Sequence, residues 1–310
     1  MKDNHSKIAI IVPYFGKWPV WMDLYLYSCG MNPCVDILFF TDCPIPSKIY
    51  SNTHFFPISF IDYKRRVSEA LSIDFNPGNG YKLCDLKPFL GVIHAKEVSD
   101  YDFWGFGDID LIFGNLSFLF NDLNLSKYDI ITTQSIHMVG PLTIVRKISK
   151  YTTACFKIKN WKKKLTNNKN LWLDECDWNT IVNPLGAFAH FLFYHIPSVK
   201  RRCTWLQEIN FHQKLSDWFY FLNRKVLVKE TYSTPPNSQI CLYNIRTSAI
   251  SYLSDWENAN LFAGKAYFHF LFYKGDNGWR EGFYKIPSDY NFGGSTDKII
   301  IDNAGIRIRT

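Results

Sequence analysis

The stretch that decides the fold is Phe103-Trp104-Gly105-Phe106-Gly107-Asp108-Ile109-Asp110-Leu111-Ile112-Phe113-Gly114. It places two carboxylates, one residue apart, in an otherwise apolar strand with glycines on both sides. Strand alternation directs Asp108 and Asp110 to one side and turns Ile109 into the core. Two neighbouring carboxylates repel each other unless a cation lies between them, and Mn²⁺ or Mg²⁺ suits such oxygen ligands. A surface turn with two solvated acids is the alternative, but the apolar strand and the glycines favour a metal site at Asp108 and Asp110.

The chain around this stretch alternates strand and helix patterns. Continuous apolar runs predict buried strands at Lys7–Val12 and Val35–Thr41, with a helical pattern between them at Trp18–Gly30. A second helical pattern, Tyr81–Lys96, precedes the acidic pair and contains Pro88, which predicts a kink or a boundary. This order predicts an α/β fold with a mostly parallel sheet flanked by helices. In such sheets ligands bind at the carboxyl ends of the strands, which is where the acidic pair stands.

Composition narrows the protein class. The 310 residues are 47% hydrophobic and 20% charged, enough apolar material for a large core and too little charge for a disordered chain. Eight scattered cysteines without a CxxC pair indicate reduced thiols. The first residues are a better strand than a signal peptide, and the apolar stretch Leu185–Pro197 is too short to span a bilayer, so we expect a cytoplasmic protein. No P-loop, GxGxxG or GxSxG motif occurs in the expected context.

Several segments together carry a family resemblance. Tyr81–Pro88 (YKLCDLKP), followed by FWGFGDIDLIFG, resembles bacterial polysaccharide-locus proteins assigned to GT-A glycosyltransferases, and the opening IAIIVPYFG and FFTD resemble that family's first two strands. More distantly, the arrangement is similar to lipopolysaccharide galactosyl- and glucosyltransferases and to glycogenin. The similarity covers roughly Lys7 to Pro141. It implies one GT-A (Rossmann-like) catalytic domain over 1–310, with a nucleotide-sugar-binding core at 7–145 and an acceptor-side and less regular C-terminal region at 146–310.

The resemblance also implies an activity. The chain is expected to be a hexosyltransferase that moves a sugar from a UDP-sugar, with retention of configuration, to a glycan or lipid-linked oligosaccharide during surface polysaccharide synthesis, such as O-antigen or capsule. The nucleotide would lie across the strand ends near Pro13, Tyr14 and Asp42. The donor would also meet residues of YKLCDLKP and the first acid of the pair. Those positions are Tyr81, Lys82, Asp85, Lys87 and Asp108. On the residues alone, Lys82, Asp85 and Lys87 also fit a solvated helix face.

A late histidine extends the predicted metal site. In relatives a histidine from a late strand is often the third metal ligand, and a lysine after it reaches the diphosphate. His269, within Ala266–Tyr273 (AYFHFLFY), and Lys274 are the matching positions here. Bulky residues stand between them where the relatives have a glycine-containing loop. This difference weakens the match of Lys274 to the family pattern more than it weakens the match of His269. A hydrogen-bonded core histidine is the alternative.

An acidic cluster between tryptophans is the candidate acceptor side. Trp172–Trp178 (WLDECDW) holds Asp174, Glu175 and Asp177. Aromatic faces stack on pyranose rings and carboxylates bind hydroxyl groups. One of these acids would be the general base in an inverting enzyme, whereas in a retaining enzyme they would position the acceptor. The alternative is a helix N-terminal turn, where acids are favoured by the helix dipole.

The basic stretch Lys157–Lys164 (KIKNWKKK) and the net charge of +7 are compatible with more than one kind of anionic partner. The stretch suits anionic lipid head groups, and a lipid-linked acceptor would bring the enzyme against the inner surface of the membrane. A solvated helix face is the alternative. No nucleic-acid-binding motif accompanies it. Nucleases and phosphatases need more metal-binding side chains than the sequence offers. A non-catalytic sugar- or nucleotide-binding protein on the same fold is the alternative to an enzyme.

Overall fold

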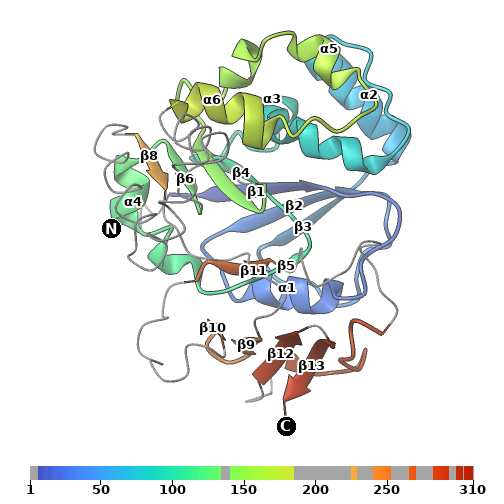
Figure 1. The fold of residues 1–310 in the computed structure, drawn as a ribbon, viewed down its shortest axis with the longest axis vertical. Coiled ribbons are helices and arrows are strands. Elements are labelled where there is room, and N and C mark those ends of the chain that lie inside the picture. The colour runs from blue at the N-terminus through green and yellow to red at the C-terminus, as the bar shows by residue number, and fades with distance from the viewer. Residues whose placement is uncertain are drawn as a thin grey trace, which may run out of the picture.

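The computed structural model describes residues 6–133, 140–184, 225–228, 240–252, 265–269, 282–292, 298–302 and 304–309. Its centre is a seven-stranded sheet of order β3-β2-β1-β4-β7-β6-β8 (Figure 1). The strands are β1 (Ile8–Pro13), β2 (Asp36–Thr41), β3 (Thr53–Pro57), β4 (Phe103–Gly107), β6 (Ile130–Thr132), β7 (Leu142–Arg146) and β8 (Val226–Val228). Only β7 runs against its neighbours β4 and β6. The predicted α/β fold with a mostly parallel sheet is therefore confirmed.

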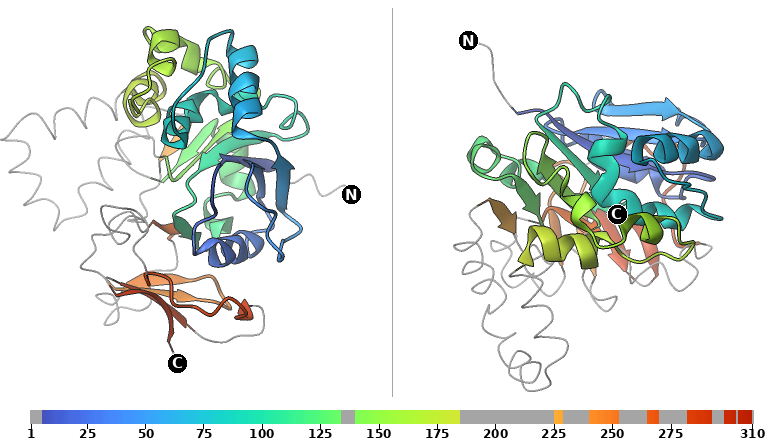
Figure 2. Two further views of the ribbon diagram at one scale, coloured as in Figure 1. Left: turned by 90° about the vertical axis from the view of Figure 1, so that its right-hand side faces the viewer. Right: turned by 90° about the horizontal axis from the view of Figure 1, so that it is seen from above.

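Helices cover both faces of this sheet. In Figure 1 α2, α3, α5 and α6 lie above the sheet and α1 lies below it, and the turned view of Figure 2 shows the same layers. The helical elements are α1 (Met22–Gly30), α2 (Phe60–Leu71), η1 (Gly80–Phe89), α3 (Leu90–Ile93), η2 (Leu116–Phe118), α4 (Asp122–Lys127), η3 (Ala154–Lys157), α5 (Trp161–Leu165), η4 (Asp174–Trp178) and α6 (Asn179–Val182). Among the described residues no helix is long and apolar enough to cross a bilayer.

The alternation of side chains along each strand explains why both faces are covered. In β1, Ile8, Ile10 and Val12 belong to the core beneath the sheet, together with α1. Ala9 and Ile11 belong to the core above it, together with α2 and α3. Successive side chains of a strand point to opposite faces, so a continuous apolar run requires a cover on each side.

Two smaller sheets lie on the α1 side. Strands β9 (Cys241–Asn244), β10 (Ile250–Tyr252), β12 (Lys298–Asp302) and β13 (Gly305–Arg309) form a sheet of order β10-β9-β12-β13, beyond α1 in Figures 1 and 2. Strand β5 (Leu111–Phe113) pairs with β11 (Tyr267–His269) in a two-stranded sheet. Strands β8 and β11 thus bring segments of the second half of the chain against the first.

Two local features differ from the sequence-based expectations. The segment predicted as one helix over Tyr81–Lys96 is a 3₁₀ helix, η1, followed by the short α-helix α3. Pro88, which lacks a backbone N–H, lies where the two meet. The strand through FWGFGDIDLIFG is broken: β4 ends at Gly107, residues 108–110 form a bend, and β5 leaves the main sheet.

Candidate metal centre

The bend between β4 and β5 places both aspartates at the carboxyl edge of the parallel strands. Ile109, between them, is buried in the core beneath the sheet. Its carbonyl oxygen accepts a hydrogen bond of 2.9 Å from the indole N–H of the fully buried Trp21, just before α1. The backbone N–H of Asp108 donates to Pro141 O at 3.3 Å. The bend is therefore fixed from both sides while its two acidic side chains remain at the edge of the sheet.

Strand pairing brings His269 to the same place. In the two-stranded sheet His269 stands opposite Leu111, the residue after Asp110. Its Nε2 atom lies 3.3 Å from Oδ2 of Asp110. Asp108, Asp110 and His269 each offer one ligand atom, and these atoms all lie within 4.8 Å of one another. Two ligands of one hard divalent cation are at most about 4–5 Å apart, so two carboxylates and an imidazole with this spacing are compatible with a divalent cation.

Lys87 joins this centre to the acidic cluster. Its Nζ lies 2.6 Å from Oδ1 of Asp108 and 3.7 Å from Oδ2 of Asp174. Burial opposes a charge on Lys87, but the carboxylates of Asp108 and Asp174 outweigh it and hold the lysine pKa well above its ordinary value. Lys87 is therefore a charged counter-ion between two carboxylates.

Asp174 and Glu175 stand on the far side of Lys87. Asp174 is 3% exposed, and burial raises its pKa to about 7, with Lys87 acting in the opposite direction. Burial also raises the pKa of Glu175. A hydrogen bond from the backbone N–H of Gly140 and the electrostatic interaction with His269 act in the opposite direction. Four carboxylates, those of Asp108, Asp110, Asp174 and Glu175, thus surround one lysine and one histidine. This excess of negative charge favours a bound cation.

Gly140 is a site residue that the sequence reasoning missed. A Cβ atom there would lie 2.3 Å from Lys87 Nζ and 3.1 Å from Oδ2 of Asp174. A larger residue at position 140 would therefore displace the end of Lys87 from its place between the two carboxylates. The available signal in the sequence was Gly140-Pro141 directly before the apolar run of β7, because a glycine beside a strand often marks a place where other groups approach the backbone closely.

The predicted nucleotide-binding residues lie at the ends of neighbouring strands. Pro13 ends β1, Tyr14 follows it, and Asp42 follows β2. Tyr14 N donates to Phe40 O, and Gly16 N donates to Oδ1 of Asp42 at 2.7 Å. Burial raises the pKa of Tyr14 to about 12, and Cys43 and then Asp110 add to the effect. The strand ends and the metal centre are therefore neighbours.

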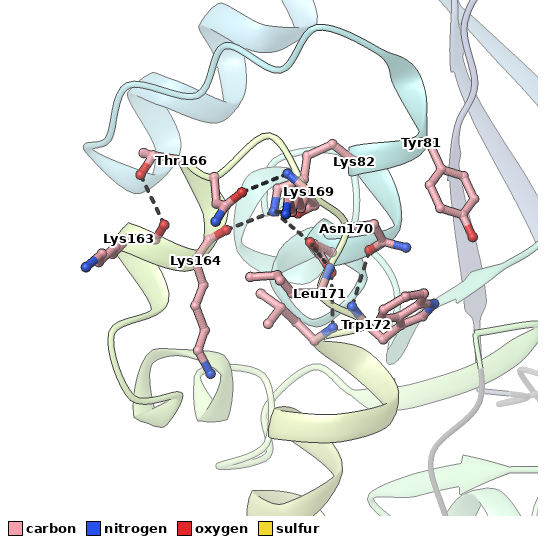
Figure 3. A network of polar contacts seen from close by, with 12 residues as sticks. Tyr81, Lys82, Lys163, Lys164, Thr166, Lys169, Asn170, Leu171 and Trp172 are labelled. Atoms are coloured by element: carbon pink, nitrogen blue, oxygen red, sulfur yellow. Dashed lines mark hydrogen bonds and ion pairs between the residues drawn. The ribbon is translucent and has the colours of Figure 1, made fainter.

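Two of the residues expected to meet the donor, Lys82 and Asp85, form a buried contact with each other, and their contact with a donor stays a prediction. Lys82 Nζ lies 2.7 Å from Oδ2 of Asp85, and both side chains are 0% exposed. Lys82 also donates to the carbonyls of Lys164 and Lys169, at 2.8 and 2.7 Å (Figure 3). Neither residue forms a solvated helix face, because the loop at 164–171 covers them. Tyr81, by contrast, is 64% exposed.

Asp177 and Lys274 are the two remaining residues expected at the site. Asp177 is directed away from the centre, with its Oδ1 atom 2.5 Å from Nζ of Lys164, because the π-helical turn η4 rotates it away from Asp174. Asp174 and Glu175 therefore lie near Lys87, whereas Asp177 contacts Lys164, and the acceptor role expected of all three acids stays a prediction. Lys274 lies outside the described residues.

Comparisons with known proteins give the family. Two crystal structures of the glycosyltransferase GlyE from Streptococcus pneumoniae TIGR4 are similar. The apo form has a TM-score of 0.33 and 12% identity, covering 77% of this chain and 70% of that chain. The second has a TM-score of 0.32 and 11% identity, covering 75% of this chain and 69% of that chain. Likeness at these TM-scores identifies no function, and no curated protein matches the sequence. The profile of a family of unknown function, DUF6625, matches residues 10–244, so the chain belongs to that family.

Proposed function

We propose that the chain is a metal-dependent glycosyltransferase of the GT-A type that moves a hexose from a nucleotide-sugar, a UDP-sugar by the sequence resemblance, to a glycan or lipid-linked oligosaccharide. The observation that carries the proposal is the grouping of Asp108, Asp110 and His269 at the carboxyl edge of the parallel strands. Open α/β sheets bind their ligands at this edge. Three protein ligands leave coordination positions for the oxygens of a diphosphate.

The residues around the centre have distinct tasks in this proposal. When bound, the cation supplies electrostatic stabilisation of the negative charge that grows on the leaving nucleotide. Lys87 adds a second positive charge at the same place, since its ammonium group already lies 2.6 Å from Asp108. Tyr14 and Asp42, at the ends of β1 and β2, flank the nucleotide.

Asp174 and Glu175 face the centre from the acceptor side. Burial raises the pKa of Asp174 to about 7, so this carboxyl group holds a proton at a higher pH than an ordinary aspartate does. A carboxyl group of this kind accepts a proton from a sugar hydroxyl more readily than an ordinary aspartate. In the inverting case it would be the general base, and in the retaining case, which the resemblance favours, it would orient the acceptor hydroxyl. Proton NMR of the first product formed gives its anomeric configuration and so distinguishes an inverting from a retaining enzyme.

We place the whole chain, 1–310, in one catalytic unit, with the nucleotide-sugar core at 7–145 and the acceptor side at 146–310. The pairing of β8 with β6 and of β11 with β5 supports this division, because both pairs join segments from either side of residue 145. The third metal ligand, His269, comes from the later segment. The early part of the chain therefore holds only two of the three ligands.

The deciding experiment is release of UDP from a panel of UDP-sugars, with Mn²⁺ and then with EDTA, by the wild type and by Asp110→Ala. Slow cleavage of one donor that requires both the metal and Asp110 would establish the reaction class and identify the sugar. Calorimetry of UDP with Mn²⁺ is the second arm. If neither cleavage nor metal-dependent nucleotide binding is seen, a non-catalytic sugar-binding protein becomes the better description.

A membrane-facing acceptor side belongs to the same proposal. Lys157, Lys159, Lys162 and Lys163 are exposed around α5, and Ile148 nearby in the chain is 86% exposed. Exposed basic residues suit the anionic inner surface of a membrane, where a lipid-linked acceptor would be held. Co-sedimentation with vesicles containing phosphatidylglycerol, but not with vesicles of phosphatidylcholine alone, is expected. Equal sedimentation with both would contradict it.

A further inference from the structure

An exposed tryptophan beside the acidic cluster has an unusual backbone. Trp172 stands two residues before Asp174, its side chain is 54% exposed, and its φ angle is +51°. A residue with a Cβ atom is disfavoured in this left-handed region, by about 1–2 kcal/mol. Such a conformation persists only where the surroundings impose it, and these places cluster at ligand-binding sites.

The buried pair of Lys82 and Asp85 imposes the conformation of Trp172. The carboxylate of Asp85 accepts hydrogen bonds from the backbone N–H groups of Leu171, at 2.9 and 3.1 Å, and Leu173, at 3.1 Å. These are the residues immediately before and after Trp172. Lys82 neutralises the carboxylate and holds the preceding part of the loop through two carbonyl groups. The backbone on both sides of Trp172 is thus tied to the interior, while its indole is left outside (Figure 3).

A second exposed aromatic residue belongs to the same arrangement. Tyr81 directly precedes Lys82, and its backbone N–H is held by Oδ1 of Asn79 at 3.0 Å. In Figure 3 the rings of Tyr81 and Trp172 lie on the same side of the buried network and point away from it. Each of the two segments joined by the Lys82–Asp85 pair therefore presents one aromatic ring outward.

We propose that Trp172, assisted by Tyr81, is a carbohydrate subsite that stacks against one pyranose ring of the acceptor. An aromatic face offers a large apolar surface with little conformational entropy to lose, which suits the apolar C–H face of a pyranose. The carboxylates of Asp174 and Glu175, next along the chain, are acceptors for the hydroxyl groups of the same sugar. The assignment of this sugar to the acceptor rests on the proposed glycosyltransferase function, whereas binding of a pyranose at Trp172 does not.

The nucleobase of the donor is the other planar group that an indole would stack on. We favour the sugar, because Trp172 directly precedes the turn η4 that carries Asp174 and Glu175 on the proposed acceptor side, whereas the proposed nucleotide-binding residues Tyr14 and Asp42 follow β1 and β2. Trp172 instead leads directly into Asp174, whose carboxylate lies on the far side of Lys87 from Asp108.

The test uses a panel of methyl α- and β-pyranosides of the common hexoses and N-acetylhexosamines, and saturation-transfer NMR on the full chain. Wild type is expected to bind at least one member. Trp172→Gly should weaken that binding about tenfold or more without lowering the melting temperature, because glycine relieves the left-handed backbone. Tyr81→Ala should weaken it less. Phe56→Ala, at an aromatic residue that is 36% exposed on the distant edge strand β3, is the matched control and should leave it unchanged.

Binding of UDP with Mn²⁺ by the same variants separates this proposal from the proposed function. Retained nucleotide binding with lost pyranoside binding in Trp172→Gly supports the subsite. Pyranoside binding without any nucleotide binding by wild type would contradict the glycosyltransferase but leave the subsite standing. Loss of UDP binding in Trp172→Gly with pyranoside binding intact would assign the indole to the nucleobase and overturn the proposal. Absence of pyranoside binding by wild type would overturn it as well.

Discussion

Removal of Lys82 tests whether the ion pair with Asp85 is a structural element. The chain offers a matched comparison, because Arg65 and Asp62 form another pair three residues apart in sequence with the same 2.7 Å separation. The side chains of Lys82 and Asp85 are 0% exposed, whereas those of Arg65 and Asp62 are 65% and 49% exposed. The two pairs thus differ chiefly in burial.

The expected magnitudes follow from that difference. Lys82→Met keeps the length of the side chain but leaves the Asp85 carboxylate buried without a counter-ion, and breaking a buried pair in this way costs about 3–5 kcal/mol. Two carbonyl groups, of Lys164 and Lys169, lose their donor as well. Arg65→Met removes an exposed partner and is expected to cost less than about 1 kcal/mol.

The assay is urea unfolding at 25 °C, followed by tryptophan fluorescence and circular dichroism. With a slope of about 2–3 kcal/mol per molar urea, Lys82→Met should lower the midpoint by about 1–2.5 M and Arg65→Met by less than about 0.5 M. Lys82→Met should also expose Trp172 further to acrylamide quenching, because the loop loses its anchor. Midpoints that agree within error for the two variants would refute the reasoning, since burial would then have no effect.

The remaining predictions concern the metal centre and its neighbours. Asp110→Asn should abolish metal-dependent donor cleavage and Mn²⁺ binding in calorimetry while leaving the circular dichroism spectrum unchanged. His269→Ala should raise the Mn²⁺ concentration for half-maximal cleavage at least tenfold, and an unchanged requirement would remove His269 from the site. Burial raises the pKa of Asp174 to about 7 in the folded state from an ordinary 3.8, so the native state binds this proton more tightly than the unfolded state does. The free energy of unfolding in EDTA should therefore fall, by up to about 4 kcal/mol, as the pH rises from about 4 to about 7. Urea titrations of Asp174→Asn should lack this pH dependence. Gly140→Ala should displace the flexible end of Lys87, lowering the rate of donor cleavage with little change in melting temperature, and wild-type rates would show that the position of Lys87 is unimportant.

The sequence predicted the sheet and the acidic pair well because both depend on local patterns. Continuous apolar runs identified β1 and β2, and the acidic pair follows β4 as predicted, although Asp108 and Asp110 lie in a bend and not in a continuous strand. His269 was reached only through the family resemblance. Its position opposite Leu111 depends on the pairing of β5 with β11, which are more than 150 residues apart, and no local pattern contains that pairing.

The contacts that local patterns did not predict arise where distant segments meet. A lysine and an aspartate three residues apart usually mark a solvated helix face, so Lys82 and Asp85 were expected on a surface or at the donor. The loop at 164–173 instead covers them, and its backbone supplies partners for both charges. Asp177 was grouped with Asp174 by proximity in sequence, but the π-helical turn directs it to Lys164.

The motif YKLCDLKP has two functions in one 3₁₀ helix, η1. In a 3₁₀ helix residues three apart eclipse one another, so Lys82 and Asp85 share one face and form their pair there. Lys87, five residues after Lys82, is rotated onto a different face, from which it reaches Asp108 and Asp174. One short helix therefore anchors the loop that carries Trp172 and Asp174, and also supplies the cation that separates Asp174 from Asp108. A change at Lys82 or Asp85 should consequently alter the pKa of Asp174 without touching it, because the loop and the counter-ion are set by the same turn.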